Sequence, residues 1–542
     1  MKMVKSLLLG SAAGIAVMSG AQAADLPVKA KAVDYVRICS LYGAGFYYVP
    51  GTDTCMKFGG FLRAEVGVNA ATSHFPGVNG NIGANDRFAH DFTFRSNLNF
   101  NVDIRTATQF GVVRVFGATN WRFDTFGAGA TSLNTAAVNG AAALGAINNY
   151  TPGNGFVTVD NAFVQFAGFT FGKSASARSV PWHTIIANNN TSSLYGGPDY
   201  VTGVNNIQYT YQFGNGLSAS IGLDEPVVFN RTNLVNVSAP STAAVAAGGS
   251  NITFLGTPPT AGSLSVGSSY AGQSIPDVVG NFKIDQAWGI FTVAGGIHEV
   301  RATYYNPSVA GPAGSILGEL SGHPDLKIGG SVTVGLQIKN VPTGPGDLFT
   351  VDATYAKGDT KSVIGTSAAS PSFAIFGNGI AGQTYQSVGF GLTSDGIFAG
   401  TNNANGTNIE LTNAYGVRAG YIHNWTPSLQ SNLFGSYSRV DYNGRATALF
   451  CGAYGTAVAG LGTTYSCNPD FAVTQVGFRT GYTPVAGLTF STEVLYVNLD
   501  QRFSGATAGN VTPSGALAKP PARYNFRDQD TVSVNFRVQR NF

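Results

Sequence analysis

Residues 92–105 read FTFRSNLNFNVDIR, and apolar and polar side chains alternate along these residues. The apolar positions share one face of an extended strand: Phe92, Phe94, Leu98, Phe100, Val102 and Ile104. The opposite face, which begins at Asp91, is polar: Thr93, Arg95, Asn97, Asn99, Asn101, Asp103 and Arg105. A long strand with one apolar face and one strongly polar face is typical of a transmembrane barrel, where it separates lipid from a watery lumen.

Segments of this kind recur along the 542 residues, although several alternate imperfectly. We count sixteen, at 55–70, 91–105, 109–120, 157–167, 168–174, 204–213, 216–224, 278–286, 288–300, 326–339, 347–358, 412–425, 428–442, 470–483, 486–500 and 529–542. The connections between them are alternately long and short, which is the pattern of outer-membrane barrels. The sequence therefore predicts an all-β fold, a 16-stranded antiparallel transmembrane β-barrel with short periplasmic turns and long outer loops.

The long connections are rich in Gly, Ala, Ser, Thr and Asn. Three stretches show this bias clearly, at 126–149, 237–269 and 365–408. Because such compositions offer few side chains for a packed core, they predict weakly structured, outward-facing loops.

The composition excludes several classes of protein. Charged residues make up only 11% of the chain, against roughly 25% in ordinary globular domains. Hydrophobic residues are 44%, which is too few for a helical membrane protein, while 71 Gly and 59 Phe plus Tyr residues suit a barrel. The net charge of +3 falls to +1 without Lys2 and Lys5, so nothing predicts nucleic-acid binding.

The N-terminus has the pattern of a secretory signal peptide. Lys2 and Lys5 precede an apolar run at 7–18, which is shorter than the roughly 20 residues of a transmembrane helix. Residues 21–23 form an A-x-A cleavage site, so we expect cleavage between Ala23 and Ala24. The predicted organisation is a signal peptide at 1–23, a periplasmic segment at 24–54 and a barrel at 55–542, located in the outer membrane.

The four cysteines form two pairs that are local in sequence, Cys39 with Cys55 and Cys451 with Cys467. Export to an oxidising compartment allows disulfides, and local pairing is the simplest of three possible connectivities. Neither pair has the C-x2-C spacing of a zinc or redox site. We therefore predict disulfides, with no metal site and no cofactor.

Aromatic residues cluster beside the short connections, where a periplasmic girdle of rings at the lipid headgroups is expected. They are Phe110, Phe169, Phe213, Trp288, Trp425, Tyr482 and the terminal Phe542.

Charged residues of the lumen are the candidates for selecting solutes. Arg63, Arg95 and Arg114 fall on the polar faces of the first three strands, and we expect them at similar depth. Two interpretations are compatible: the arginines create a positive field in the pore, or they pair with Glu65, Asp91 and Asp103 along the wall.

A sixteen-stranded barrel leaves an aqueous channel that an inward-folded loop can narrow. The third long connection, at 175–203, is the candidate for this constriction. It contains Arg178, Trp182, His183, Tyr195 and Asp199.

Two stretches carry a resemblance to a known family. Residues 35–60, YVRICSLYGAGFYYVPGTDTCMKFGG, and residues 160–173, DNAFVQFAGFTFGK, resemble the alphaproteobacterial porins of the Brucella and rhizobial type, as does the terminal aromatic strand. The resemblance implies a homotrimer of sixteen-stranded barrels for passive diffusion of ions and small hydrophilic solutes. It also implies an inward-folded third loop with acids opposite the wall arginines, and it makes Phe542 a signal for the barrel-insertion machinery.

The sequence departs from this family pattern in the third loop. Asp199 is the only acid in 175–203, whereas Lys173 and Arg178 are basic. A strong transverse field is therefore not expected, and we predict weak or mildly anion-favouring selectivity from Arg63, Arg95, Arg114, Lys173, Arg178 and Asp199.

Three other functions compete with a diffusion pore. A barrel enzyme needs a nucleophile beside an oriented base, and no such motif accompanies the six histidines. A ligand-gated transporter needs a plug domain, for which residues 24–54 are too few. A substrate-specific channel stays open as the alternative, with Phe61, Trp182 and Tyr195 as possible lining residues.

Overall fold

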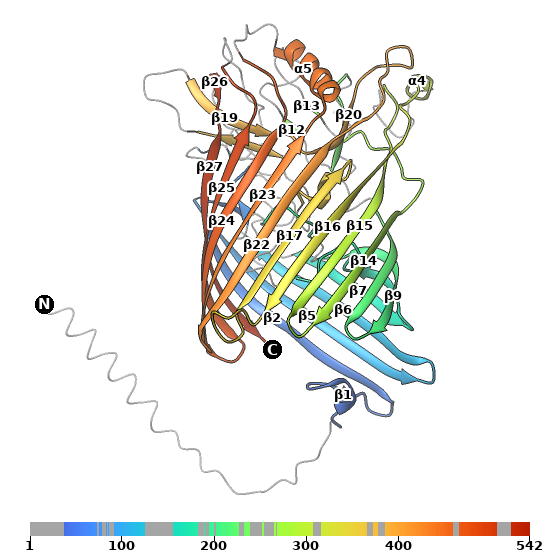
Figure 1. The fold of residues 1–542 in the computed structure, drawn as a ribbon, viewed down its shortest axis with the longest axis vertical. Helices are drawn as coiled ribbons and strands as arrows, with labels where there is room; N and C mark the ends of the chain where they lie inside the picture. The colour runs from blue at the N-terminus through green and yellow to red at the C-terminus, as the bar shows by residue number, and fades with distance from the viewer. Residues whose placement is uncertain are drawn as a thin grey trace, which may run out of the picture.

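The computed structural model contains the predicted barrel (Figure 1). It describes residues 37–542 except 73–74, 79–82, 84, 86–90, 125–155, 183–188, 190–193, 200–201, 227–231, 239–251, 254–264, 267, 307–315, 366–371, 378–384, 459–464 and 507–521. The barrel strands are β2 (Thr54–Val68), β5 (Phe92–Thr108), β6 (Gly111–Asp124), β7 (Phe156–Phe166), β8 (Phe169–Ser174), β9 (Val204–Gly214), β10 (Leu217–Asp224), β14 (Asp277–Gln286), β15 (Gly289–Val300), β16 (Lys327–Lys339), β17 (Leu348–Lys357), β22 (Asn413–Thr426), β23 (Leu429–Asp441), β24 (Phe471–Val485), β25 (Leu488–Gln501) and β27 (Gln529–Asn541). Each pairs antiparallel with its neighbours, and β2 also pairs with β27, which closes the sheet.

The alternation seen in the sequence separates the two sides of the wall. On β5, Phe92 and Phe94 are exposed on the outer face, while Thr93, Arg95 and Asn97 are buried. Because the side-chain period of a strand is two, the sequence pattern fixes which residues face the lumen.

The aromatic residues beside the short turns all lie at the outer surface. Their side chains are 43–73% exposed: Phe110, Phe169, Phe213, Trp288, Trp425, Tyr482 and Phe542. The rings of the expected girdle therefore all face outward.

Both disulfides join the cysteines that are local in sequence, as predicted. Cys39 and Cys55 form a small core with Phe46, in a knob that contains η1 (Ser40–Tyr42) and β1 (Tyr47–Tyr48). The knob lies near the lower end of the barrel in Figure 1, beside the start of β2. Residues 1–36, with the expected cleavage site, lie outside the described residues.

The described parts of the long loops are more ordered than their composition predicts. The small elements are β3 (Ala70–Thr72), β4 (Phe75–Pro76), β11 (Asn233–Asn236), β12 (Ile252–Thr253), β13 (Ser265–Val266), α4 (Ile316–Leu320), η7 (Thr360–Ser362), β18 (Phe373–Phe376), β19 (Tyr385–Gly391), β20 (Ser394–Phe398), β21 (Glu410–Leu411), α5 (Gly444–Val458) and β26 (Arg523–Phe526). No helix of the described residues is long and apolar enough to cross a membrane.

A hydrophobic core joins these loops above the barrel. It includes Phe373, Phe390, Phe450 and Tyr524, which come from three different long connections. In Figure 1 the loop strands and α5 gather over the upper end of the barrel. The prediction of weak structure was wrong for the described part of 365–408, because aromatic side chains spaced among the small residues pack together.

Candidate functional site

The third loop folds into the barrel. The indole Nε1 of Trp182 donates to Asp352 Oδ2 on β17 at 3.0 Å, and the backbone N–H of Tyr195 donates to Gln475 Oε1 on β24 at 2.7 Å. Between them, Asn189 Nδ2 donates to Asn535 Oδ1 on β27 at 2.8 Å. A loop that leaves β8 and returns to β9 therefore reaches strands on the far side of the lumen, which confirms the predicted inward fold of the third loop.

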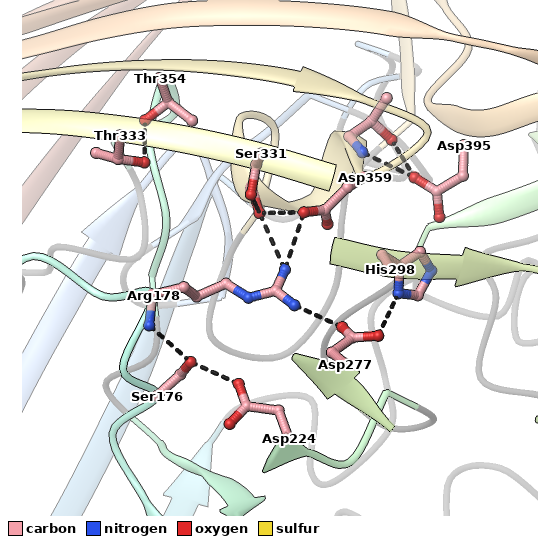
Figure 2. Close-up of polar contacts among 12 residues, drawn as sticks. Ser176, Arg178, Asp224, Asp277, His298, Ser331, Thr333, Thr354, Asp359 and Asp395 are labelled. Carbon is pink, nitrogen blue, oxygen red and sulfur yellow. Dashed lines mark hydrogen bonds and ion pairs between the residues drawn. The ribbon is translucent and has the colours of Figure 1, made fainter. Parts of the chain in front are cut away.

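The base of this loop is fixed by Arg178, as Figure 2 shows. Its guanidinium lies between two carboxylates, with Nη2 2.5 Å from Asp277 Oδ2 and Nη1 2.9 Å from Asp359 Oδ2. Asp277 also contacts His298 Nδ1 at 2.8 Å. Since Arg178 is only 1% exposed, it acts as an anchor for the loop and does not line the pore, which corrects the expectation for this residue.

A second anchor joins the third loop to the segment that follows β17. The Gly196 N–H donates to the Val363 carbonyl oxygen at 2.7 Å. Burial lowers the pKa of Lys361 to about 8, against the attraction of Asp199, Asp395 and Asp359. Asp199 is itself 4% exposed, so this acid belongs to the loop contact rather than to the solvent-filled passage.

The wall formed by β27, β2, β5 and β6 carries a row of alternating charges. In register across these strands lie Arg537, Glu65, Arg95 and Asp124. Arg95 Nε is 2.7 Å from Asp124 Oδ1, and Arg95 Nη1 is 3.9 Å from Glu65 Oε2. Arg537 also pairs with Glu65. Arg95 is therefore in the predicted wall, but its charge is matched by acids.

The adjacent row carries positive charge without carboxylate partners. Arg63, Asn97 and Arg122 lie in register on β2, β5 and β6. Arg63 Nε donates to Gln539 Oε1 at 3.0 Å. Within the described part of the chain, neither Arg63 nor Arg122 has a carboxylate within 4.0 Å. Within the described residues, this row therefore carries positive charge that no ion pair balances.

Arg114 lies elsewhere. It aligns with Arg105 near the opposite end of β5 from Arg95, and its Nη2 is 3.0 Å from Asp103 Oδ2. The expectation that Arg63, Arg95 and Arg114 share one depth is wrong for Arg114, because the long β5–β6 hairpin offsets the register. The expected pairing with Asp103 is present.

Lys173 lies at the end of β8 and is half-buried. Its Nζ donates to the carbonyl oxygen of Asp160 at 2.9 Å and contacts that of Thr202. Lys173 therefore holds the two ends of the third loop together. His183 lies outside the described residues.

Three further basic residues of the lumen wall were not among the predicted site residues: Arg122, Arg479 and Arg537. Arg122 has the same strand parity as Arg114, but the predicted strand ended at 120 and β6 continues to Asp124. Arg479 Nε donates to Asn189 Oδ1 of the third loop at 2.6 Å. Strand parity alone would have placed all three residues on the lumen face.

Comparisons with known proteins agree with this geometry. A family model described as a porin subfamily matches residues 25–535. Porin Omp2b of Brucella suis is 33% identical over 227 residues, and that of Brucella melitensis is 32% identical over the same length. Each alignment covers 41% of this chain and 54% of the relative, so the match spans about half of the relatives' length.

Among solved structures, the outer-membrane channel DcaP of Acinetobacter baumannii has the same fold. The superposition has a TM-score of 0.51 at 14% sequence identity, and it covers 91% of this chain and 99% of that protein.

Proposed function

Because the chain belongs to the porin subfamily whose model matches residues 25–535, we propose that it forms a passive, water-filled diffusion channel for ions and small hydrophilic solutes. The family and the closed sixteen-stranded barrel make it a multi-pass β-barrel of the outer membrane. Family membership indicates a channel rather than an enzyme. One observation carries the proposal: a polar loop crosses a lumen with charged walls, as in a pore that screens solutes by size and charge.

The selectivity we propose is mildly anion-favouring. The wall row of Arg537, Glu65, Arg95 and Asp124 balances its own charges, whereas Arg63 and Arg122 add positive charge in the next row. The acids of the third-loop region, Asp199 and Asp359, are buried in loop contacts. A narrow passage with an excess of arginine raises the local anion concentration.

The test is reconstitution of the refolded protein, without residues 1–23, in a planar lipid bilayer. We expect ohmic conductance steps in potassium chloride and a reversal potential of the anion-selective sign in a salt gradient. A clear cation preference would contradict the proposed selectivity, and the absence of conductance from a folded barrel would contradict the channel itself.

Four further assignments extend this proposal. The assembly is a homotrimer, so conductance should increase in groups of three steps. Residues 1–23 are a signal peptide cleaved after Ala23, and Ala24–Thr54 form a periplasmic segment. The terminal Phe542 serves as a recognition signal for the barrel-insertion machinery.

A substrate-specific channel is the second candidate. Trp182 and Tyr195 are fully buried against the wall, so they do not supply an exposed aromatic track for a sugar or a similar solute. Phe61 is half-buried, and its ring lies 4.4 Å from the guanidinium carbon of Arg63. A current that one class of solute blocks at low concentration would favour this candidate.

A further inference from the structure

Two adjacent rows of the lumen wall differ in how their charges are matched. In one row, Arg95 and Arg537 each have a carboxylate as an ion-pair partner. In the next row, strand pairing sets Asn97 directly between Arg63 and Arg122. Since neighbouring strands lie about 4.8 Å apart, the Cα atoms of these two arginines are roughly 10 Å apart. Both guanidiniums can therefore reach one small solute that lies between them on the lumen side of Asn97.

The second row also contains hydrogen-bonding atoms without partners. Arg122 Nε and Asn97 Oδ1 are buried and have no hydrogen-bond partner within the described residues. Asn97 is 2% exposed. Buried polar atoms are nearly always paired, and a guanidinium withdrawn from bulk water is costly unless an anion or hydrogen bonds compensate it. Among the described residues, the Arg122 Nε–H therefore lacks an acceptor and Asn97 Oδ1 lacks a donor.

Charges on the surrounding strands act on both arginines, with bases in the majority at Arg63 and acids in the majority at Arg122. The groups that act on Arg63 are Arg537, Arg95, Arg122 and the single acid Glu65. The acids that act on Arg122 are Asp160, Asp124 and Glu65. Asp124 and Glu65 are already paired with arginines, and Asp160 accepts a hydrogen bond from the Asn120 side chain. The acids thus reduce the positive potential without supplying a direct partner to either arginine.

We propose that Arg63, Asn97 and Arg122 bind a small divalent oxyanion in transit through the lumen. Two guanidiniums suit a solute whose two negative charges are carried by oxygen, because each can donate two parallel hydrogen bonds. The Asn97 carboxamide can turn its NH₂ group toward such a ligand. The site deepens the proposed channel function and rests on it for its access to solutes.

Binding can be measured without any current. Refolded protein in detergent is heated at constant ionic strength while sulfate replaces chloride, and the unfolding temperature is followed. A ligand that binds only the folded barrel raises this temperature in a saturable manner. For the unmodified chain, we expect the rise in unfolding temperature to saturate with sulfate concentration. The apparent Kd for sulfate should be at least about tenfold weaker in R63Q and in R122Q.

A matched control is R114Q, which also removes one lumen arginine, but one that is paired with Asp103. It should keep the saturable sulfate response. The double variant R63Q/R122Q reports the general stabilisation that sulfate gives to any folded protein. If the response of R122Q equals those of R114Q and the unmodified chain, the site is overturned. R122K keeps the charge, so an intermediate response supports recognition by the guanidinium fork.

Succinate, tested beside sulfate, shows whether the site prefers a compact dianion or one whose two charges are separated. A response to sulfate alone indicates a compact oxyanion held by both arginines, and a response to succinate alone indicates two separated carboxylates. Either response supports a dianion site, whereas a response to neither overturns it.

Chloride currents in a planar bilayer separate this proposal from the channel itself. Micromolar to millimolar sulfate should reduce the chloride conductance of the unmodified channel, and about tenfold more should be needed in R122Q. Normal conductance without a sulfate-dependent rise in unfolding temperature contradicts the site and leaves the channel standing. A rise in unfolding temperature without conductance contradicts the channel and supports the site.

Discussion

The indole ring of Trp182 lies directly on the backbone of Gly335. A Cβ atom built on Gly335 would be 2.4 Å from Cζ2 of the indole, a separation that atoms in contact do not allow. Trp182 is fully buried, and its Nε1 donates to Asp352 on the strand next to Gly335. The absence of a side chain at Gly335 thus determines how closely the third loop approaches the wall.

The substitution G335A should displace Trp182 and loosen the third loop, at a cost of about 1–3 kcal/mol. Trp121, Trp288 and Trp425 are all more than half exposed, so a red shift of tryptophan emission would report mainly on Trp182. The control G117A places its Cβ at an ordinary 3.7 Å from Val102 Cγ1. Equal emission spectra for G335A and the unmodified chain would contradict this packing.

Arg178 should be more sensitive to substitution than its position in a loop implies. It is the shared partner of Asp277 and Asp359, and removing one member of a buried ion-pair cluster typically costs about 3–5 kcal/mol. R178Q should therefore free the base of the third loop and increase flickering of the single-channel current. R178K should rescue only in part, since a lysine cannot donate in a fork to two carboxylates.

The exposed Arg301 provides the control for Arg178. Its Nη1 donates to the Gly272 carbonyl oxygen, so R301Q removes the same charge without opening a buried cluster. Current records for R178Q that match those of R301Q would show that Arg178 does not hold the loop.

The barrel was predictable from the sequence because the two-residue alternation of apolar and polar side chains is a local pattern. The sixteen predicted strands correspond to β2 through β27 within a few residues, since alternation over about ten residues directly encodes which side faces lipid. The shift of Arg114 relative to Arg95 was not predictable in the same way, because register between strands depends on turn geometry and on unequal strand lengths.

The contacts of the long loops could not be predicted from local sequence patterns. Nothing local marks Arg178 as the partner of Asp359, which is 181 residues away. A charge-poor loop offers few long-range pairing signals, and small residues conceal the aromatic positions that build the core. Strand parity predicts that Arg122 faces the lumen, but only for a strand that continues to Asp124. The predicted strand ended at residue 120.

The second disulfide should hold α5 against the hydrophobic core that the long loops form. Cys451 and Cys467 are separated by 16 residues, and closing a loop of this length stabilises the folded state by about 3 kcal/mol in chain-entropy models. The variant C451S/C467S should become sensitive to proteases within residues 444–470 while the barrel strands stay resistant. Fragment masses after brief digestion provide the measurement, and unchanged cleavage would assign no stabilising role to this disulfide.

Asp347, in the turn before β17, should contribute stability that depends on pH. Burial alone would raise the pKa of this carboxyl, but hydrogen bonds from Thr343, the Asn424 N–H, His423 and Tyr421 hold it well below its usual range. A group with a lowered folded-state pKa stabilises the protein above its unfolded pKa, near 3.9, and this contribution is lost as the pH falls below that value.

The unfolding temperature in detergent should therefore fall below about pH 4, and D347N should show a flatter profile with a lower plateau at neutral pH. The control D285N alters a carboxylate that is 41% exposed and paired with Lys339. Parallel pH profiles for D347N and the unmodified chain would contradict the assignment.

The last residue closes the seam of the barrel. Gly60 N–H donates to the Phe542 carbonyl oxygen at 3.2 Å, and Phe542 N–H donates to the Gly60 carbonyl oxygen at 3.1 Å. Gly60 adopts φ +154°, and a Cβ there would overlap the Asn99 carbonyl oxygen. Deleting Phe542 removes both hydrogen bonds and the exposed ring, so it cannot by itself separate closure of the barrel from recognition by the insertion machinery.

F542A makes this separation, because it retains the backbone bonds to Gly60 and removes only the ring. If the ring is the recognition signal, F542A should reduce the amount of assembled protein in the outer membrane about as much as the deletion, whereas purified F542A should refold in detergent at the normal rate. F542Y should restore assembly. Normal membrane levels of F542A together with loss in the deletion variant would assign the role of this residue to seam closure alone.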